Sequence, residues 1–313
     1  MKKIKVLLAS PRGFCAGVKR AVDIVDFALK NSKEPVYVRH EIVHNERVVN
    51  DLKRKGAVFV KELEEVPKKS KVIFSAHGVS KKVKQDSKVY KQLTIDATCP
   101  LVSKVHQQIK LYNKRGYKIL LIGHKGHPEV DGIEGQVDQK IIIIENEKQA
   151  KELNIKDKID KIAYVTQTTL SLDDTSEIIK ILRKKFPKIV GPDLDDICYA
   201  TQNRQIAVSE LADLCDLVFV VGGENSSNTK RLAEIVRKKS IPVYRISGKQ
   251  DININWLRGI TTLGITSGAP SPEILIEEII LLLRNIYTQV NVKNLKGIKE
   301  EITFKPLKKF SQP

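Results

Sequence analysis

Hydrophobic and polar residues follow one another along this chain in two kinds of stretch. Short apolar runs such as residues 4–9 have the composition of buried strands, whereas Val18, Val22, Val25 and Leu29 recur at the spacing of a helix with one apolar face. Strand-like and helix-like stretches alternate throughout, which is typical of parallel sheets covered by helices. We therefore predict an α/β protein.

The apolar runs are too short for a membrane protein. Runs such as residues 141–144 and 279–283 fall far below the roughly 20 residues that a membrane-spanning helix needs. The N-terminus passes from Met1 and two lysines directly into a strand-like segment, without the apolar stretch and small-residue cleavage site of a secretory signal. We expect a cytoplasmic protein with no membrane partner.

The chain has four cysteines, and three of them lie in polar, turn-like surroundings. Cys15, Cys99 and Cys198 each precede a helix-like stretch, at residues 17–30, 101–114 and 201–214. Cys215 instead lies in the apolar stretch 211–221, which favours a buried structural thiol. Because disulfides are rare in a reducing cytosol, the other three cysteines indicate metal binding or catalysis.

The surroundings of these three cysteines repeat along the chain. After each helix-like stretch comes a strand-like segment with a polar loop, which places His44, His127 and Ser226 at nearly equal distances from the cysteines. A third strand and loop follows in each repeat, with His77 in the first, Thr168 in the second, and Ser267 and Ser271 in the third. The pattern predicts three α/β modules, residues 1–97, 98–195 and 196–285, followed by a tail, residues 286–313.

Ligands of parallel sheets bind beyond the carboxyl ends of the strands, which is where all these polar loops would lie. Three modules arranged about a pseudo-threefold axis would bring the three cysteines and their loops together. The repeat therefore predicts one shared site.

The chain carries a formal net charge of +18. Its basic residues are spread over helix-like segments such as 53–55, 183–185 and 237–239, which favours a solvated surface over a nucleic-acid interface. A positive surface also attracts anionic substrates and acidic electron-carrier proteins. We expect no nucleic-acid partner.

Three converging thiolates can hold either zinc or an iron-sulfur cluster. Structural zinc sites usually use closely spaced cysteine pairs, and no CxxC occurs here, so the cluster is favoured while zinc stays open. The same loops carry imidazole, hydroxyl and amide groups near the starts of helices, an arrangement that binds a diphosphate. These groups belong to His44, His77, His127, Ser226, Ser227 and Asn228.

Eight segments of the chain together resemble the 4-hydroxy-3-methylbut-2-enyl diphosphate reductases, the IspH or LytB family. They are GFCAGVKRAV, HEIVHNERVV, SAHGVS, DATCPLV, GHKGHPEV, TQTTLSLDDT, DDICYATQNRQ and GGENSSN, and the likeness covers residues 4–285. The family's fold, three α/β modules around a central cluster, agrees with the repeat. The resemblance implies the last step of the non-mevalonate (MEP/DOXP) isoprenoid pathway, in which two electrons and two protons remove an allylic hydroxyl as water to give isopentenyl and dimethylallyl diphosphate.

The resemblance also implies roles for individual residues. Cys15, Cys99 and Cys198 would hold one 4Fe-4S cluster, with the fourth iron open to the substrate. Glu129 matches the acid that delivers a proton, with Thr168 as its relay, and a carboxyl enclosed beside an anionic ligand has the raised pKa that a general acid needs. The expected substrate-binding residues are His44, His77, His127, Thr168, Ser226, Ser227, Asn228 and Ser271.

One departure from the family pattern concerns the last phosphate loop. Relatives usually have Gly-Ala-Ser, a variable residue and Pro, whereas this chain has Pro270 before Ser271, so that the serine is displaced by one position. Ser271 reaches the phosphate only if the loop shifts.

Two other functions stay open at this point: a cluster-dependent hydro-lyase, and a basic zinc protein that binds nucleic acid. Redox activity separates the first from a reductase, and metal analysis separates the second. Because no GxGxxG follows a predicted strand, we expect electrons from a ferredoxin or flavodoxin type of donor.

Overall fold

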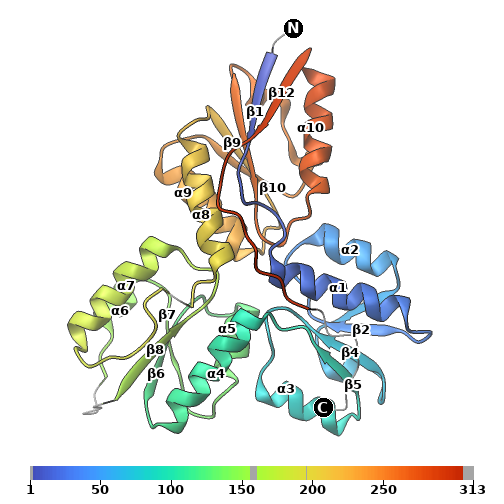
Figure 1. Cartoon of the computed structure of the whole chain (residues 1–313). Coiled ribbons are helices and arrows are strands. Elements are labelled where there is room, and N and C mark those ends of the chain that lie inside the picture. Colours follow the sequence, from blue (N-terminus) through green and yellow to red (C-terminus); the bar gives the residue numbers. More distant parts are fainter. Residues whose placement is uncertain (1–2, 156–160, 195, 306–313) are drawn as a thin grey trace. The chain divides into compact units, whose positions relative to one another are not determined.

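The computed structural model describes residues 3–155, 161–194 and 196–305 (Figure 1). Within this part of the chain all pairings between named strands are parallel, and the strands form three sheets. The chain divides into two units. The first unit is Met1–Val18, His44–Asn50 and Tyr199–Thr303, and the second is Lys19–Val43, Asp51–Cys198 and Phe304–Pro313.

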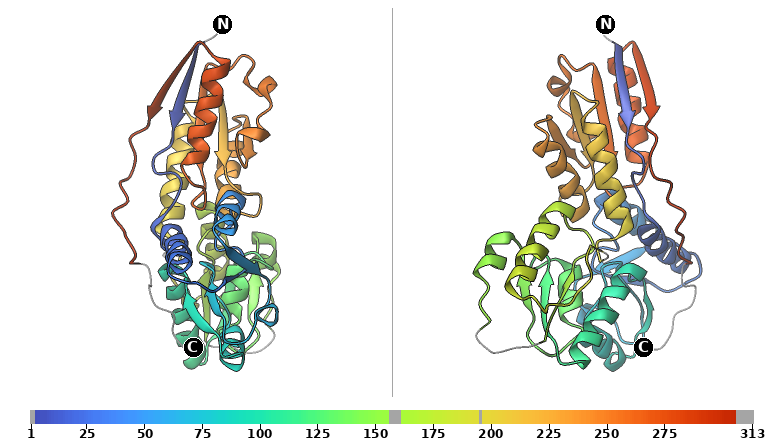
Figure 2. Two further views of the ribbon diagram at one scale, coloured as in Figure 1. Left: turned by 90° about the vertical axis from the view of Figure 1, so that its right-hand side faces the viewer. Right: turned by 60° about the vertical axis from the view of Figure 1, so that its left-hand side comes forward.

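The first unit is built on a five-stranded sheet. Its strands, in spatial order, are β10(Val243–Ile246), β9(Leu217–Val221), β11(Thr262–Ser267), β1(Lys3–Leu8) and β12(Gln289–Asn294). Helices α8(Tyr199–Ala212) and α9(Ser227–Lys238) cover one face, and α10(Ile274–Ile286) covers the other (Figures 1 and 2). Two short 3-10 helices, η2(Lys249–Asp251) and η3(Ile254–Leu257), follow β10.

The two faces of this sheet follow from the alternation of side chains along a strand. Val6 and Leu8 of β1 pack with the apolar side of α10, whereas Leu7 packs with α8 and α9. All three are at most 4% exposed, so the sheet is buried on both faces, as expected for parallel strands.

The second unit contains the other two sheets. One has the order β3(Ala57–Val60), β2(Val36–Arg39), β4(Lys71–Phe74), β5(Leu93–Asp96), and the other has the order β7(Ile142–Ile144), β6(Lys118–Ile122), β8(Ile162–Thr166). The helices of this unit are α3(Lys81–Val89), α4(Pro100–Lys114), α5(Pro128–Glu134), α6(Glu147–Glu152) and α7(Leu172–Lys185), with the 3-10 helix η1(Leu63–Glu65). Helices α1(Ala16–Lys30) and α2(Glu46–Arg54) begin in the first unit and end in the second.

The predicted α/β fold with parallel sheets is confirmed. The helices predicted after the three cysteines are α1, α4 and α8, which begin within two residues of the expected positions. Among the described residues, none of the helices combines the length and the apolar character that crossing a membrane requires.

Strand pairing departs from the predicted module boundaries at two points. Strand β1, expected in the first module, pairs with β11 and β12 in the five-stranded sheet. The segment expected to be a tail supplies β12 itself, which lies alongside β1 over its whole length. The boundaries at residues 97, 195 and 285 stay a prediction, but both ends of the chain contribute strands to the sheet of the third module.

Candidate active site

The predicted site residues divide between the two units. Those of the first unit are Cys15, His44, Ser226, Ser227, Asn228 and Ser271, and those of the second are His77, Cys99, His127, Glu129, Thr168 and Cys198. Most of them lie in loops that follow the carboxyl end of a strand, the edge at which parallel sheets bind ligands.

In the second unit, Glu129 and Thr168 form a buried pair. Glu129 is the second residue of α5, and its Oε1 accepts a hydrogen bond from the backbone N–H of Thr168 at 2.7 Å. Its Oε2 is 3.0 Å from the Thr168 hydroxyl. The carbonyl of Thr168 accepts in turn from the N–H of Cys198 at 3.1 Å. A single residue after β8 therefore connects the candidate acid with a candidate cluster ligand.

Burial raises the pKa of Glu129 to about 7, although the two hydrogen bonds from Thr168 act in the opposite direction. The negative charge of Asp196 adds to the upward shift. The carboxyl is 2% exposed, so its charged form has lost most of its hydration. A pKa close to neutral allows this group both to hold and to release a proton under physiological conditions.

The imidazole rings of His77 and His127 meet edge to face, with their centroids 5.8 Å apart. His127 is the N-cap of α5, and its Nδ1 accepts from the N–H of Glu129 at 3.1 Å. This bond fixes the tautomer, because an accepting Nδ1 leaves the ring proton on Nε2. His77 follows β4, and its Nδ1 is 3.4 Å from the Ser75 hydroxyl. The two rings thus stand together next to Glu129, with His127 held as an Nε2–H donor.

The three candidate cluster ligands lie just before helices. Cys15 precedes α1 and its Sγ accepts from the N–H of Val18 at 3.5 Å, Cys99 is the N-cap of α4, and Cys198 immediately precedes α8. Helix N-termini stabilise thiolates, the form that binds metal. All three are partly exposed, and no disulfide joins cysteines within the described ranges. Their chemistry therefore fits a metal or iron-sulfur centre.

The described residues do not themselves contain a group of three His, Cys, Asp or Glu side chains spaced to hold a metal ion. Cys15 belongs to the first unit, and Cys99 and Cys198 belong to the second. The complete ligand set stays a prediction.

Cys215 behaves as expected of a structural thiol. It is 8% exposed and packs among the apolar residues of α8, α9 and β9. Burial raises its pKa to about 12, so that it stays protonated at neutral pH. A Cβ atom on Gly264 would lie 2.8 Å from its sulfur, which shows how tightly the thiol is enclosed.

In the first unit, Ser226 and Asn228 begin helix α9. Ser226 is its N-cap, and its Oγ accepts from the N–H and the hydroxyl of Thr229 at 3.2 and 2.9 Å. The Oδ1 of Asn228 accepts from the N–H of Ala269 at 3.0 Å, which connects the loop after β9 with the loop after β11. Both side chains are 3% exposed. Ser226 and Asn228 are therefore buried at the carboxyl end of this sheet.

Ser271 lies in the same group of loops, but its hydroxyl is directed inward. Its Oγ donates to the carbonyl of Val221 at 2.9 Å and accepts from the side-chain amide of Asn45 at 3.4 Å. The single hydroxyl proton is thus used within the protein. Ser267, at the end of β11, is fully buried, and its hydroxyl has no hydrogen-bond partner among the described residues. Ser267, which the third repeat also carries, is therefore a second candidate for the last phosphate loop.

His106 of α4 packs against the loop that carries His77, a contact that no motif in the sequence predicts. A Cβ atom on Gly78, whose φ is +85°, would lie 2.6 Å from the His106 ring, and one on Gly132 would lie 3.3 Å from the Gly78 carbonyl. Burial lowers the pKa of His106 to about 4 and keeps it neutral. The backbone that carries His77 is therefore packed between α4 and α5 without room for a side chain.

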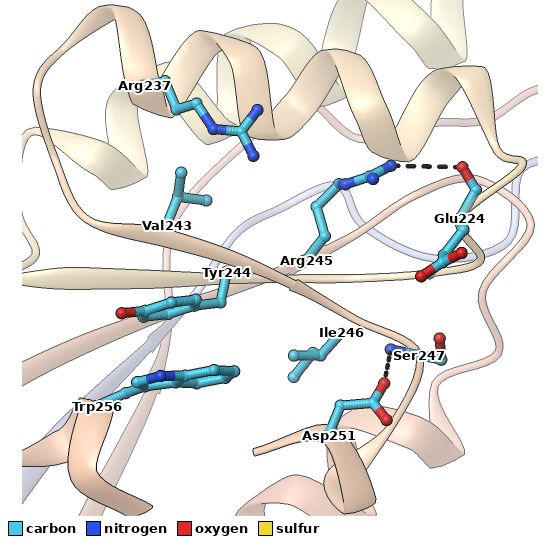
Figure 3. Close-up of a pocket in the computed structure, with 10 residues that line it drawn as sticks. Glu224, Arg237, Val243, Tyr244, Arg245, Ile246, Ser247, Asp251 and Trp256 are labelled. Carbon is cyan, nitrogen blue, oxygen red and sulfur yellow. Dashed lines mark hydrogen bonds between the residues drawn. The ribbon is translucent and has the colours of Figure 1, made fainter. Parts of the chain in front are cut away.

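A cavity of about 450 Å³ lies at the edge strand β10 of the first unit (Figure 3). Arg237 and Arg245 lie on one side of the strand, while Tyr244 and Trp256 stack on the other with centroids 3.7 Å apart. It contains none of the predicted site residues. Its two arginines are balanced by the carboxylates of Glu224 and Asp251, so its charge favours no class of ligand.

A cavity of about 170 Å³ in the second unit adjoins the loops of His77 and His127. It is lined by Arg39, which pairs with Glu62 at 3.1 Å, and by His40 and Asp131. Burial raises the pKa of Asp131, and the charge of His40 opposes this. The predicted residues thus have a polar cavity beside them within their own unit.

Comparisons with known proteins agree over nearly the whole chain. A family model described as LytB protein matches residues 6–284. Proteins named 4-hydroxy-3-methylbut-2-enyl diphosphate reductase from Mannheimia succiniciproducens and Nitrosomonas europaea are 50% and 49% identical, over 96% and 98% of this chain and 96% and 97% of their own.

Two solved structures are also similar. The E-1-hydroxy-2-methyl-but-2-enyl-4-diphosphate reductase from Plasmodium falciparum has a TM-score of 0.91 at 39% identity, covering 96% of this chain and 94% of its own. A structure of (E)-4-hydroxy-3-methyl-but-2-enyl diphosphate reductase, described as the terminal enzyme of the non-mevalonate pathway, has a TM-score of 0.65 at 33% identity, covering 90% and 99%. With half of its residues identical to those of named reductases over almost its full length, the chain belongs to the LytB family.

Proposed function

We propose that this chain reduces 4-hydroxy-3-methylbut-2-enyl diphosphate to isopentenyl diphosphate and dimethylallyl diphosphate, the last step of the non-mevalonate pathway. The allylic carbon–oxygen bond breaks, two electrons and two protons are consumed, one proton leaves with the hydroxyl as water, and the other is added to the allylic carbon skeleton. The observation that carries the proposal is the buried Glu129–Thr168 pair beside Cys198, in a chain whose relatives bear the name of this reductase. A hydro-lyase needs no reductant and is not favoured by any of these relatives.

Cys15, Cys99 and Cys198 would hold a 4Fe-4S cluster. Their positions before helices, their partial exposure and the absence of disulfides among the described cysteines suit thiolate ligands. When bound, such a cluster would pass electrons from an external donor to the substrate. Zinc would need the same thiolates but cannot supply electrons.

Glu129 would hold the proton that lets the hydroxyl leave as water. With a pKa of about 7, a large fraction of the carboxyl is protonated at neutral pH. The Thr168 hydroxyl, 3.0 Å from Oε2, can accept this proton while donating its own, which is how a hydroxyl acts as a relay. The bond from the Thr168 N–H to Oε1 keeps the carboxyl oriented toward the relay.

The diphosphate would be held by imidazole, hydroxyl and amide groups from both units. In the second unit, the Nε2–H of His127 and the neighbouring ring of His77 can donate to phosphate oxygens. In the first unit, the start of α9 adds backbone N–H groups and a positive dipole end near Ser226 and Asn228. His44 and Ser227 complete the proposed set, and Ser271 or Ser267 would serve the last phosphate loop.

The electron donor would be a ferredoxin or flavodoxin type of protein in the cytoplasm. A chain with net charge +18 attracts acidic carriers electrostatically, and this attraction weakens with salt. Turnover driven by such a carrier should therefore fall as ionic strength rises, whereas turnover driven by a small uncharged reductant should not.

The test is an anaerobic assay of the purified full-length chain with the hydroxymethylbutenyl diphosphate and a low-potential reductant, with products identified by mass spectrometry. We expect both isoprenoid diphosphates, with iron and acid-labile sulfide in the protein. Glu129→Gln should lose turnover, whereas Glu134→Gln on the same helix α5 serves as the matched control and should retain it. Conversion without reductant, or protein that contains zinc and no iron, would refute the proposal.

A further inference from the structure

Two buried arginines outside the predicted site bond to the backbone of cysteine loops. Arg204 of α8 is fully buried. Its Nε and Nη2 both donate to the carbonyl of Gly13, at 3.1 and 2.8 Å, and its Nη1 donates to the carbonyl of Ala200 at 2.9 Å. A carboxylate from the C-terminal segment, Glu300, accepts from Nη1 at 2.9 Å and from Nη2 at 3.3 Å. All three guanidinium nitrogens are thereby used.

Both backbone groups of Gly13 are hydrogen-bonded. Its φ of +63° is in the left-handed region that favours glycine, and a Cβ atom there would lie 3.2 Å from the carbonyl of Ser271. Its N–H donates to the carbonyl of Ser267 at 3.4 Å, and its own carbonyl is held by Arg204. Cys15 follows two residues later, so the path of the backbone into Cys15 is set at Gly13.

Arg20 has the corresponding role in the second unit. It is 8% exposed, and its Nη1 donates to the carbonyl of Thr98 at 3.0 Å, one residue before Cys99. Its Nε donates to the carbonyl of Lys305, again in the C-terminal segment, at 3.2 Å. Arg20 is the fifth residue of α1 and Arg204 is the sixth of α8, so they occupy nearly equivalent places in helices that begin after a cysteine.

We propose that Arg204 and Arg20 are positioning residues for the Cys15 and Cys99 loops, and that residues 295–305 of the C-terminal segment are a structural part of the cluster site. Each arginine lies on the helix after one cysteine and holds the loop of another: the helix after Cys198 holds the Cys15 loop, and the helix after Cys15 holds the Cys99 loop. The role toward a cluster rests on the proposed function. The contacts themselves do not.

Burial explains why the C-terminal segment is needed. A guanidinium removed from water is strongly destabilising unless its charge and its N–H groups are matched. The Glu300 side chain, 14% exposed and also bonded to the Asn203 amide at 3.2 Å, supplies that charge for Arg204. Without Glu300, the guanidinium would turn toward other acceptors and release the Gly13 carbonyl. The family model ends at residue 284, so this partner lies outside the region that it matches.

Glu300→Gln is the sharpest variant, because Arg204 is wholly buried and its removal risks the fold. The neighbouring Glu301 is the matched control, since its side chain is 78% exposed and pairs only with Lys299 among the described residues. In the full-length holoenzyme we expect amide hydrogen exchange in residues 11–18 to be about tenfold faster in Glu300→Gln than in Glu301→Gln, the effect of losing one charge-assisted hydrogen bond. Exchange in β9 is the internal reference and should not change.

Arg20→Gln tests whether the helix after Cys15 holds the loop of Cys99. A purely local effect would disturb α1, whereas positioning predicts faster exchange at residues 96–100 and unchanged exchange at residues 11–18. Anaerobic release of iron to a chelator should accelerate about tenfold in both Arg20→Gln and Glu300→Gln, by the same hydrogen-bond arithmetic. Equal exchange in Glu300→Gln and Glu301→Gln, or a uniform rise that includes β9, would overturn the inference. A wild-type chain that binds no iron would refute the proposed function and leave the exchange comparison to decide the positioning.

Discussion

Glu129→Gln tests whether the acidic proton of Glu129 matters apart from the size and hydrogen bonds of its side chain. A protonated Glu129 can accept from the Thr168 N–H through Oε1 and donate to the Thr168 hydroxyl through Oε2, and a glutamine amide can make the same two bonds. The variant therefore imitates the neutral carboxyl at every pH. Any difference between the two proteins that depends on pH reports the charge on Glu129.

The size of the pH-dependent difference in unfolding free energy follows from the raised pKa of Glu129. Burial raises the pKa of Glu129 to about 7 in the folded chain, whereas the ordinary pKa of a glutamate, 4.5, applies to the unfolded chain. The folded state thus binds more protons between these values, and the free energy of unfolding falls as pH rises through this window. From about pH 5 to pH 8 the wild type should lose about 2 to 3 kcal/mol relative to Glu129→Gln, at about 1.4 kcal/mol per pKa unit.

Infrared difference spectroscopy measures the titration directly. The carbonyl stretch of a protonated carboxyl should be present in the wild type at low pH, disappear with a midpoint near pH 7, and be missing from Glu129→Gln. Urea unfolding of both anaerobic proteins at several pH values then measures the free-energy difference. A midpoint near the ordinary value of 4.5, or parallel pH profiles of stability, would refute the burial argument.

The turnover rate should depend on the protonation of Glu129. A general acid must be protonated to act, so the wild-type rate should fall above about pH 7. Glu129→Gln should be slower by roughly 10²- to 10⁴-fold below pH 7, and this difference should narrow as the pH rises above 7. Substrate binding should persist, because the neutral amide preserves the shape of the site. Near wild-type turnover in the variant would mean that protons arrive by another route.

Four further predictions test the other roles. Serine in place of Cys15, Cys99 or Cys198 should abolish iron binding, whereas Cys215→Ser should not, and iron analysis would contradict the ligand set if Cys215 proved essential. Thr168→Val keeps both backbone bonds and should retain iron while losing turnover; an unimpaired rate would remove it as the relay. Asn228→Ala should raise the substrate dissociation constant about 10- to 100-fold at normal iron content, as judged by calorimetry, and unchanged affinity would exclude it from the site. Ser267→Ala should weaken binding more than Ser271→Ala, because the Ser271 proton is held by Val221; the reverse order would show that the loop shifts.

The sequence was sufficient for the elements whose pattern is local. Helices α1, α4 and α8 lie where the apolar spacing after each cysteine predicts them, because one face of each packs on a sheet. The membership of β1 and β12 in one sheet was not predictable in this way. Strand β12 is an edge strand whose residues are half-buried or exposed, so no apolar run marks it, and its pairing with β1 joins opposite ends of the chain.

In the candidate site, too, some features could be predicted from local motifs and others depend on residues far away in the sequence. The motifs identified Glu129 and Thr168, and burial of the carboxyl supports the raised pKa expected of an acid. The direction of the Ser271 hydroxyl, by contrast, depends on the Val221 carbonyl in a strand far away in sequence. Arg204 was overlooked for a similar reason, since both of its distant partners, Gly13 and Glu300, come from the two ends of the chain. Hydrogen-bond partners of this kind are chosen by tertiary packing, which no local spacing encodes.

The backbone and the side chain of Thr168 have different roles in the candidate site. Its N–H orients Glu129 and its carbonyl orients Cys198, and both groups belong to the backbone that leaves β8. Its hydroxyl is the part of the side chain that contacts the carboxyl, donating to Oε2 of Glu129 at 3.0 Å. The candidate acid and the candidate cluster ligand are therefore held by bonds that any residue other than proline could make at this point, whereas the proposed proton relay depends on one oxygen. Because the backbone bonds need no particular side chain, the geometry around Thr168 should stay constant when its hydroxyl oxygen is removed, so that Thr168→Val isolates the proposed relay from the positions of Glu129 and Cys198.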